Sequence, residues 1–65
     1  MEYEIEAPPS IDQLTKRFEE ECYFGDDRAA AEYAYVLAVR TREVGNLDEA
    51  RRYAAEALRL AKQIP

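Results

Sequence analysis

Apolar residues recur at helical spacing in three successive segments of this chain, and short polar turns separate the segments. In the first segment, residues 10–23, the apolar positions form a single stripe made of Ile11, Leu14, Phe18 and Cys22. That spacing predicts a helix with one buried face. Ser10, with Gln13 three residues later, forms a capping-box pattern that predicts the helix start. Gly25 and the aspartates after it predict the helix end and the next N-cap.

The second segment, residues 28–44, carries apolar residues on two sides of the predicted helix. At 100° per residue, one face holds Ala30, Tyr33, Ala34, Leu37, Thr41 and Val44. The far side holds Tyr35, Val36 and Val39, beside Glu32, Arg42 and Glu43. A helix of this kind is predicted to lie between two packing partners. Because the preceding helix has a single apolar stripe, we expect the far side to be left uncovered.

The third segment, residues 48–63, follows a short connection that contains Gly45 and Asn46. So short a connection predicts an antiparallel hairpin, with Asp48 as the N-cap of the third helix. We expect this helix to pack closely through Leu47, Ala50, Ala54, Ala57, Leu58 and Ala61. A second shoulder of the helix remains partly apolar and comprises Tyr53, Leu60 and Ile64.

Residues 31–62, about half the chain, carry a characteristic set of positions, namely Leu37-Ala38, Gly45, Asp48-Glu49-Ala50 and Ala57-Leu58. In these positions and their spacing, the segment resembles a single tetratricopeptide repeat. The resemblance implies an all-α fold, a three-helix bundle like that of tetratricopeptide repeats, with one N-terminal helix and an antiparallel helical hairpin. The segment departs from the family pattern, which has large aromatic residues or a closing proline, at Ala34, Thr41, Ala54 and Lys62.

The resemblance also implies a function in binding protein surfaces. In this family, the inner surface of the first repeat helix commonly holds peptide ligands, and the matching positions are Glu32, Tyr35, Val39, Arg42 and Glu43. The lysine and asparagine set of carboxylate-clamping repeats is absent, so capture of a peptide's terminal carboxylate is not supported. Because such units usually need about three copies to be stable, we expect a partner to complete this single copy.

Size and composition strengthen the expectation of a partner. A chain of 65 residues buries only about 60% of its unfolded surface, and such domains often rely on disulfides, metals or oligomerisation. The single cysteine excludes an intramolecular disulfide, and the absence of histidine argues against structural zinc. We therefore predict binding to another protein or to itself, as a homodimer. The predicted partner-binding residues are Tyr35, Val36, Val39, Arg42, Tyr53 and Leu60.

The inventory of reactive side chains argues against catalysis. The chain has no histidine for acid–base chemistry, and its two glycines are too far apart for a phosphate-binding loop. Its acidic runs lack the spacing of a calcium loop. We predict no enzyme activity, cofactor, metal or small-molecule substrate. No basic group flanks Cys22 to favour the thiolate, so we expect a small core residue there rather than a reactive thiol.

The N-terminal residues 1–9 alternate acidic and apolar positions and end in Ala7-Pro8-Pro9. We expect a flexible acidic tail here, followed by a single three-helix domain over residues 10–65. An arm that becomes ordered on a partner is the alternative. The N-terminus lacks the basic end and apolar core of a signal peptide, and no apolar run approaches the ~20 residues that cross a bilayer. We expect a cytoplasmic protein without membrane contact.

Charge is distributed unevenly along the chain. Residues 1–32 carry ten acidic and three basic side chains, a net charge of −7, whereas residues 33–65 carry four acidic and six basic ones, a net charge of +2. The acidic total argues against direct nucleic-acid binding. It supports a second hypothesis, an acidic regulator or inhibitor that occupies a basic nucleic-acid-binding surface of another protein, because clustered carboxylates can imitate phosphates.

Overall fold

Local side-chain caps define where the first helix of this chain begins. The computed structural model describes residues 8–64 and contains the helices α1 (Ile11–Phe24), α2 (Asp27–Glu43) and α3 (Leu47–Gln63). The Ser10 hydroxyl accepts a hydrogen bond from the Gln13 backbone N–H at 3.2 Å, and the Gln13 side chain accepts one from the Ser10 N–H at 2.9 Å. The predicted capping box is thereby confirmed.

The turn between α1 and α2 forms as the sequence predicts. Gly25 adopts φ 78°, in the left-handed region that favours glycine, and its N–H donates to the Cys22 carbonyl at 3.3 Å. The Asp26 carboxylate then accepts a hydrogen bond from the Ala29 N–H at 3.1 Å and caps α2. These contacts satisfy backbone groups that a helix end leaves without partners.

The turn between α2 and α3 corrects one prediction, because Asn46 and not Asp48 caps α3. Gly45 has φ 84°, and the Asn46 side chain accepts a hydrogen bond from the Glu49 N–H at 3.3 Å. The helix begins at Leu47, so Asp48 lies in its first turn. A carboxylate in that position still interacts favourably with the N-terminal end of the helix dipole.

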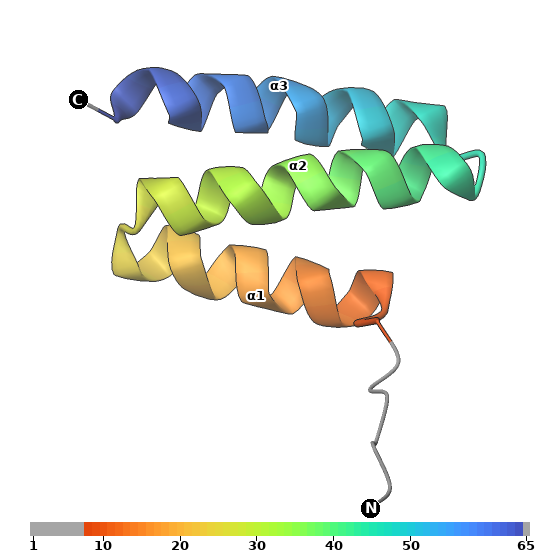
Figure 1. Cartoon of the computed structure of the whole chain (residues 1–65), viewed down its shortest axis with the longest axis horizontal. Coiled ribbons are helices and arrows are strands. Elements are labelled where there is room, and N and C mark those ends of the chain that lie inside the picture. Colours follow the sequence, from red (N-terminus) through yellow and green to blue (C-terminus); the bar gives the residue numbers. More distant parts are fainter. Residues whose placement is uncertain (1–7, 65) are drawn as a thin grey trace, which may run out of the picture.

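The three helices lie side by side in one layer, and each runs antiparallel to its neighbour (Figure 1). The middle helix, α2, packs against α1 on one side and against α3 on the other. This arrangement confirms the predicted all-α fold of three helices with an antiparallel hairpin. Within the described residues, no helix has the length and apolarity that a membrane span requires.

The core lies where α2 meets its two neighbours. Its centre consists of Leu14 from α1, Leu37 from α2 and Tyr53 from α3. Thr41 is also buried, and its hydroxyl donates to the Leu37 carbonyl at 2.7 Å, so this polar group keeps a partner. The half-buried side chains packed against the centre are Ile11, Phe18, Tyr33 and Ala38.

The face that α3 turns toward the core differs from the predicted one. Tyr53 and Leu60, which the sequence pattern places at a partner interface, are buried at 7% and 3% exposure. The Tyr53 ring meets the Phe18 ring edge to face, with centroids 5.8 Å apart. Burying this ring removes far more apolar surface from water than burying an alanine methyl group. The predicted packing residues that are exposed instead are Leu47, Ala54, Leu58 and Ala61.

Two further predicted core residues lie at helix ends and are exposed. Cys22, the last member of the α1 stripe, lies one turn beyond Phe18 and lines an open hollow together with Phe18 and with Glu56 of α3. Val44 follows the last residue of α2, where the chain turns at Gly45. Both side chains therefore remain open to solvent.

The N-terminal segment is described from Pro8 onward, so the predicted flexible tail lies mostly outside the described residues. Just before α1, the Pro9 carbonyl accepts a hydrogen bond from Arg40 Nη1 at 3.1 Å. This contact ties the entry of α1 to the C-terminal half of α2.

Candidate interaction surface

An apolar strip runs along the exposed side of α2. This α2 strip comprises Tyr35, which is 66% exposed, and Val36 and Val39, which are 39% and 40% exposed. Arg42 continues it toward the α2–α3 turn and is exposed as well. The structure thus brings four of the predicted partner-binding residues onto one surface. The other two, Tyr53 and Leu60, lie in the core.

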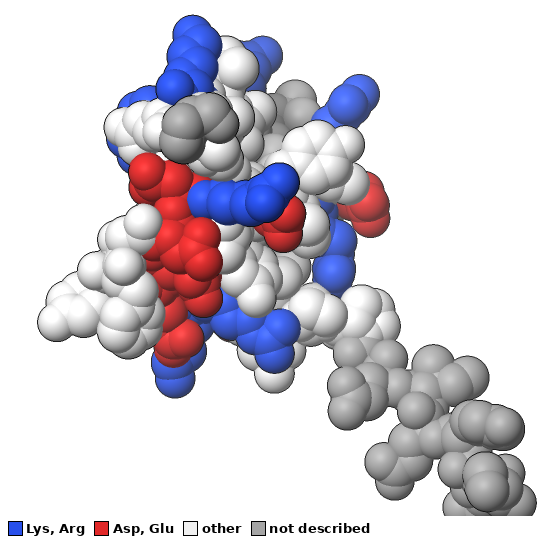
Figure 2. Space-filling view, turned by 60° about the vertical axis from the view of Figure 1, so that its left-hand side comes forward, with Lys and Arg blue, Asp and Glu red and all other residues white. Residues whose placement is uncertain are grey.

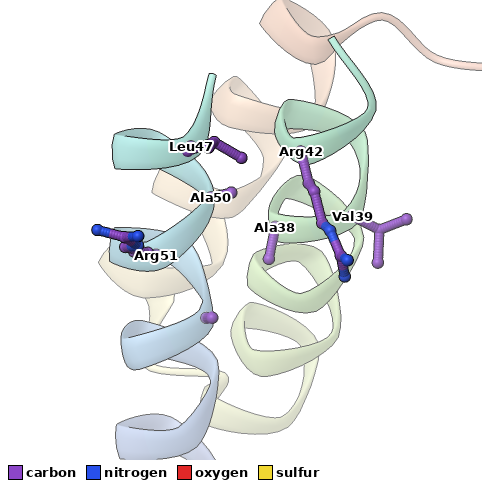
Figure 3. Close-up of a pocket in the computed structure, with 7 residues that line it drawn as sticks. Ala38, Val39, Arg42, Leu47, Ala50 and Arg51 are labelled. Carbon is purple, nitrogen blue, oxygen red and sulfur yellow. The ribbon is translucent and has the colours of Figure 1, made fainter. Parts of the chain in front are cut away.

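A groove between α2 and α3 adjoins the α2 strip. Its larger part has a volume of about 740 Å³ and is lined by Ala31, Glu32, Tyr35, Val36, Ala38, Ala54, Ala57, Leu58 and Ala61. Its smaller part, nearer the turn, has a volume of about 310 Å³ and is lined by Ala38, Val39, Arg42, Leu47, Ala50, Arg51 and Ala54 (Figure 3). Ala38 and Ala54 belong to both parts, which therefore form one continuous α2–α3 groove.

Small side chains create the α2–α3 groove. Ala38 from α2 and Ala54 from α3 end at Cβ, so they leave a hollow that larger residues would fill. The alanine stripe that the sequence predicts as a close helix contact therefore forms the floor of an open groove. Leu58, which is 60% exposed, and Tyr35 line the same part of it. The result is an apolar surface in contact with water.

Charged side chains of opposite sign lie at the two parts of the α2–α3 groove. Figure 3 shows Arg42 on α2 and Arg51 on α3 at the smaller part of the groove, and Glu32 lines the larger part. Among the residues that the structure describes, neither arginine has a carboxylate within ion-pair distance. Within residues 8–64, the ion pairs lie in α3 and join Arg52 to Glu49 and Arg59 to Glu56.

Besides the exposed Val44 and Leu47, two apolar features of the described surface are not predicted by the sequence pattern. One is Leu58 in the groove wall. The other is the pair of Tyr23 and Phe24 at the end of α1, which are 86% and 76% exposed and meet edge to face with centroids 5.3 Å apart. Their position off the α1 stripe, directly before the helix-ending Gly25, is the signal that could have identified them.

Acidic side chains gather in a band at the end of the molecule where α1 passes into α2 (Figure 2). Cys22 lies in this environment. Partial burial, followed by the negative charges of Glu56, Asp27 and Glu19, raises the pKa of the Cys22 thiol, and only the nearby Arg59 lowers it. A raised pKa leaves less thiolate at neutral pH, so nucleophilic chemistry is not favoured at this residue.

Within residues 8–64, no cluster of three or more histidine, cysteine, aspartate or glutamate side chains is arranged to hold a metal ion. Comparison with protein-family models, with curated proteins and with solved structures finds no match for this chain. A function for the chain must therefore be inferred from the exposed apolar surface and the charges around it.

Proposed function

We propose that this chain is a small protein–protein interaction module that binds through the α2 strip and the α2–α3 groove. The observation that carries the proposal is a continuous exposed apolar surface, which extends from Tyr35 and Val39 on α2 to Leu58 on α3. Soluble monomers rarely expose large contiguous apolar patches, and such patches commonly mark interfaces. Tyrosine and arginine, which are enriched at interfaces, are both present here as Tyr35 and Arg42.

The helical hairpin supports a module of the tetratricopeptide-repeat type. The antiparallel pair of α2 and α3 corresponds to one repeat, and α1 takes the place of the second helix of a preceding repeat. The family's ligand surface corresponds to the exposed side of α2, where Tyr35 and Val39 lie. On this basis we infer an adaptor, assembly factor or subunit, bound to another protein or to itself, without catalytic activity or a cofactor.

Occupation of the groove should also stabilise the fold. Burial of exposed apolar surface contributes about 25 cal/mol per Å², or roughly 1 kcal/mol for each half-exposed side chain such as Leu58. A domain of this length has a total stability of about 3 to 10 kcal/mol. A bound partner should therefore raise the melting temperature measurably, in a concentration-dependent manner.

The acidic band of Figure 2 favours a second function, an acidic regulator that covers a basic nucleic-acid-binding surface of another protein. Salt separates the two functions. At about 0.5 M salt the Debye length is roughly 4 Å, so exposed charges are strongly screened while apolar contacts persist. Binding that survives this salt supports the groove, and binding that disappears supports the acidic band.

The substitution Val39→Asp tests the interaction surface. Because Val39 is 40% exposed, the new carboxylate is solvated in the free chain but loses water when a partner covers it. We expect the helical circular-dichroism signal to persist and self-association or partner capture to be lost. Val44→Asp is the matched control, since it places the same charge at an exposed valine outside the groove.

Two results would count against this proposal. The first is a wild-type chain that is a stable folded monomer and enriches no protein from lysate, because the groove would then bind nothing. Unfolding of the Val39→Asp variant, with Val44→Asp still folded, would place Val39 in the core.

A further inference from the structure

Charged residues flank the α2 strip symmetrically. Glu32 and Arg42 lie five residues to either side of Leu37, and Tyr35 and Val39 lie two residues to either side of it. At 100° per residue, these four exposed positions fall within about 80° of one another around α2. They therefore form one face, with a carboxylate at one end, a guanidinium at the other and apolar side chains between them.

A second copy of this face complements the first when the two helices run antiparallel. Rotation about a two-fold axis level with Leu37 places Glu32 of each copy near the partner's Arg42, and Tyr35 near the partner's Val39. A parallel pairing would instead place Glu32 against the partner's Glu32 and Arg42 against the partner's Arg42, and juxtaposed like charges are unfavourable. The charge pattern therefore selects the antiparallel orientation.

A second pair of charged residues on α2 is also complementary in the antiparallel pairing. Arg28 and Glu43 are exposed near the two ends of α2. In the antiparallel pairing, Arg28 of one copy and Glu43 of the other copy fall within one helical turn of each other, about 4.5 Å along the axis. Neither these residues nor Glu32 and Arg42 form an ion pair with any described residue of their own chain. Their charges are thus available for contacts across a two-fold interface, where each pair occurs twice.

We propose that the occupant of the α2 strip is a second copy of this chain, packed antiparallel with α2 against α2. This proposal rests on the proposed interaction function and specifies its partner and orientation. Each copy covers the Tyr35, Val36 and Val39 side chains of the other. The adjoining groove extends the contact toward Leu58 on α3.

Charge reversal tests this pairing. Each single variant, Glu32→Arg or Arg42→Glu, places like charges together at two symmetric positions of the dimer. We expect each to raise the dimer Kd about tenfold or more in sedimentation velocity at low salt. An equimolar mixture of the two variants should form a heterodimer, because their altered faces are complementary. The double variant Glu32→Arg/Arg42→Glu should regain the wild-type homodimer.

The control is the charge swap Arg17→Glu/Glu20→Arg on exposed positions of α1, which should leave the dimer Kd unchanged. Circular dichroism of every variant verifies that the fold is kept. If the single variants dimerise normally, or if neither the mixture nor the double variant recovers the dimer, the antiparallel pairing is overturned.

The oligomeric state of the wild type separates this proposal from the broader one. A wild-type chain that stays monomeric at millimolar concentration overturns the second copy as occupant. If that monomer still binds another protein in a manner that Tyr35→Ala abolishes, the interaction function stands with a different partner. If it binds no protein, both proposals fail.

Discussion

Replacing Tyr53 with alanine removes the aromatic ring through which α3 contacts α1. The ring lies in the core with Leu14 and Leu37, and it meets the Phe18 ring edge to face at 5.8 Å between centroids. Truncation of a buried large aromatic residue to alanine costs about 3 to 5 kcal/mol, because apolar burial is lost and a cavity remains. The edge-to-face contact with Phe18 adds to this loss.

That cost is large compared with the stability of so short a chain. At roughly 0.05–0.15 kcal/mol per residue, the free energy of unfolding is about 3 to 10 kcal/mol. For domains of this size, a loss of 1 kcal/mol lowers the melting temperature by about 4–8 °C. We therefore expect Tyr53→Ala to melt at least about 12 °C below the wild type, or to be unfolded at room temperature.

Thermal unfolding followed by far-ultraviolet circular dichroism measures this difference, at micromolar concentration where self-association contributes least. Tyr35→Ala is the matched control, because it removes the same side chain from a position that is 66% exposed. Exposed substitutions usually change stability by no more than about 0.5 kcal/mol, which corresponds to less than about 4 °C. Equal melting temperatures for the two variants would refute the assignment of Tyr53 to the core.

Two further outcomes are expected. Ala54→Leu fills the groove where its two parts join. We expect a normal melting temperature by circular dichroism and about tenfold weaker association by sedimentation. A large drop in melting temperature would instead place Ala54 in a close helix contact. The raised pKa of Cys22 should make alkylation by iodoacetamide at neutral pH slower in the folded chain than in urea. Arg59→Ala should slow it further, because Arg59 lowers this pKa. Equal rates in the folded and unfolded chains would contradict the raised pKa.

The helices could be predicted from the sequence because their determinants are local. Ser10 and Gln13 cap α1 across three residues, and Gly25 ends it through its own backbone conformation. The predicted N-cap of α3, Asp48, is wrong, because Asn46 is an equally good capping residue and takes that position. The choice between them depends on where Gly45 turns the chain.

The rotation of α3 could not be predicted from periodicity alone. An alanine stripe through Ala54 and a second stripe through Tyr53 and Leu60 have the same helical spacing, so spacing alone does not decide which of them faces the core. The decision comes from Phe18 on α1, a tertiary contact.

One side of the candidate surface follows from local sequence patterns, and the other depends on tertiary packing. Tyr35 and Val39 are exposed as expected, because the single stripe of α1 cannot cover both sides of α2. The prediction that Leu58 packs in the hairpin is wrong, because its exposure depends on the rotation of α3. The sequence thus indicates the α2 side of the surface, and the packing of α3 supplies the groove.

Sedimentation velocity of the chain, labelled with a fluorophore at Cys22, tests the interaction surface most directly. Cys22 is exposed and lies outside the groove, so the label leaves the surface free. In buffer and in cell lysate, the wild type is compared with Val39→Asp. We expect the wild type to sediment as a species larger than the 7.5 kDa chain, and Val39→Asp as a monomer. A wild type that sediments as a folded monomer in both media would contradict an interaction function for the groove.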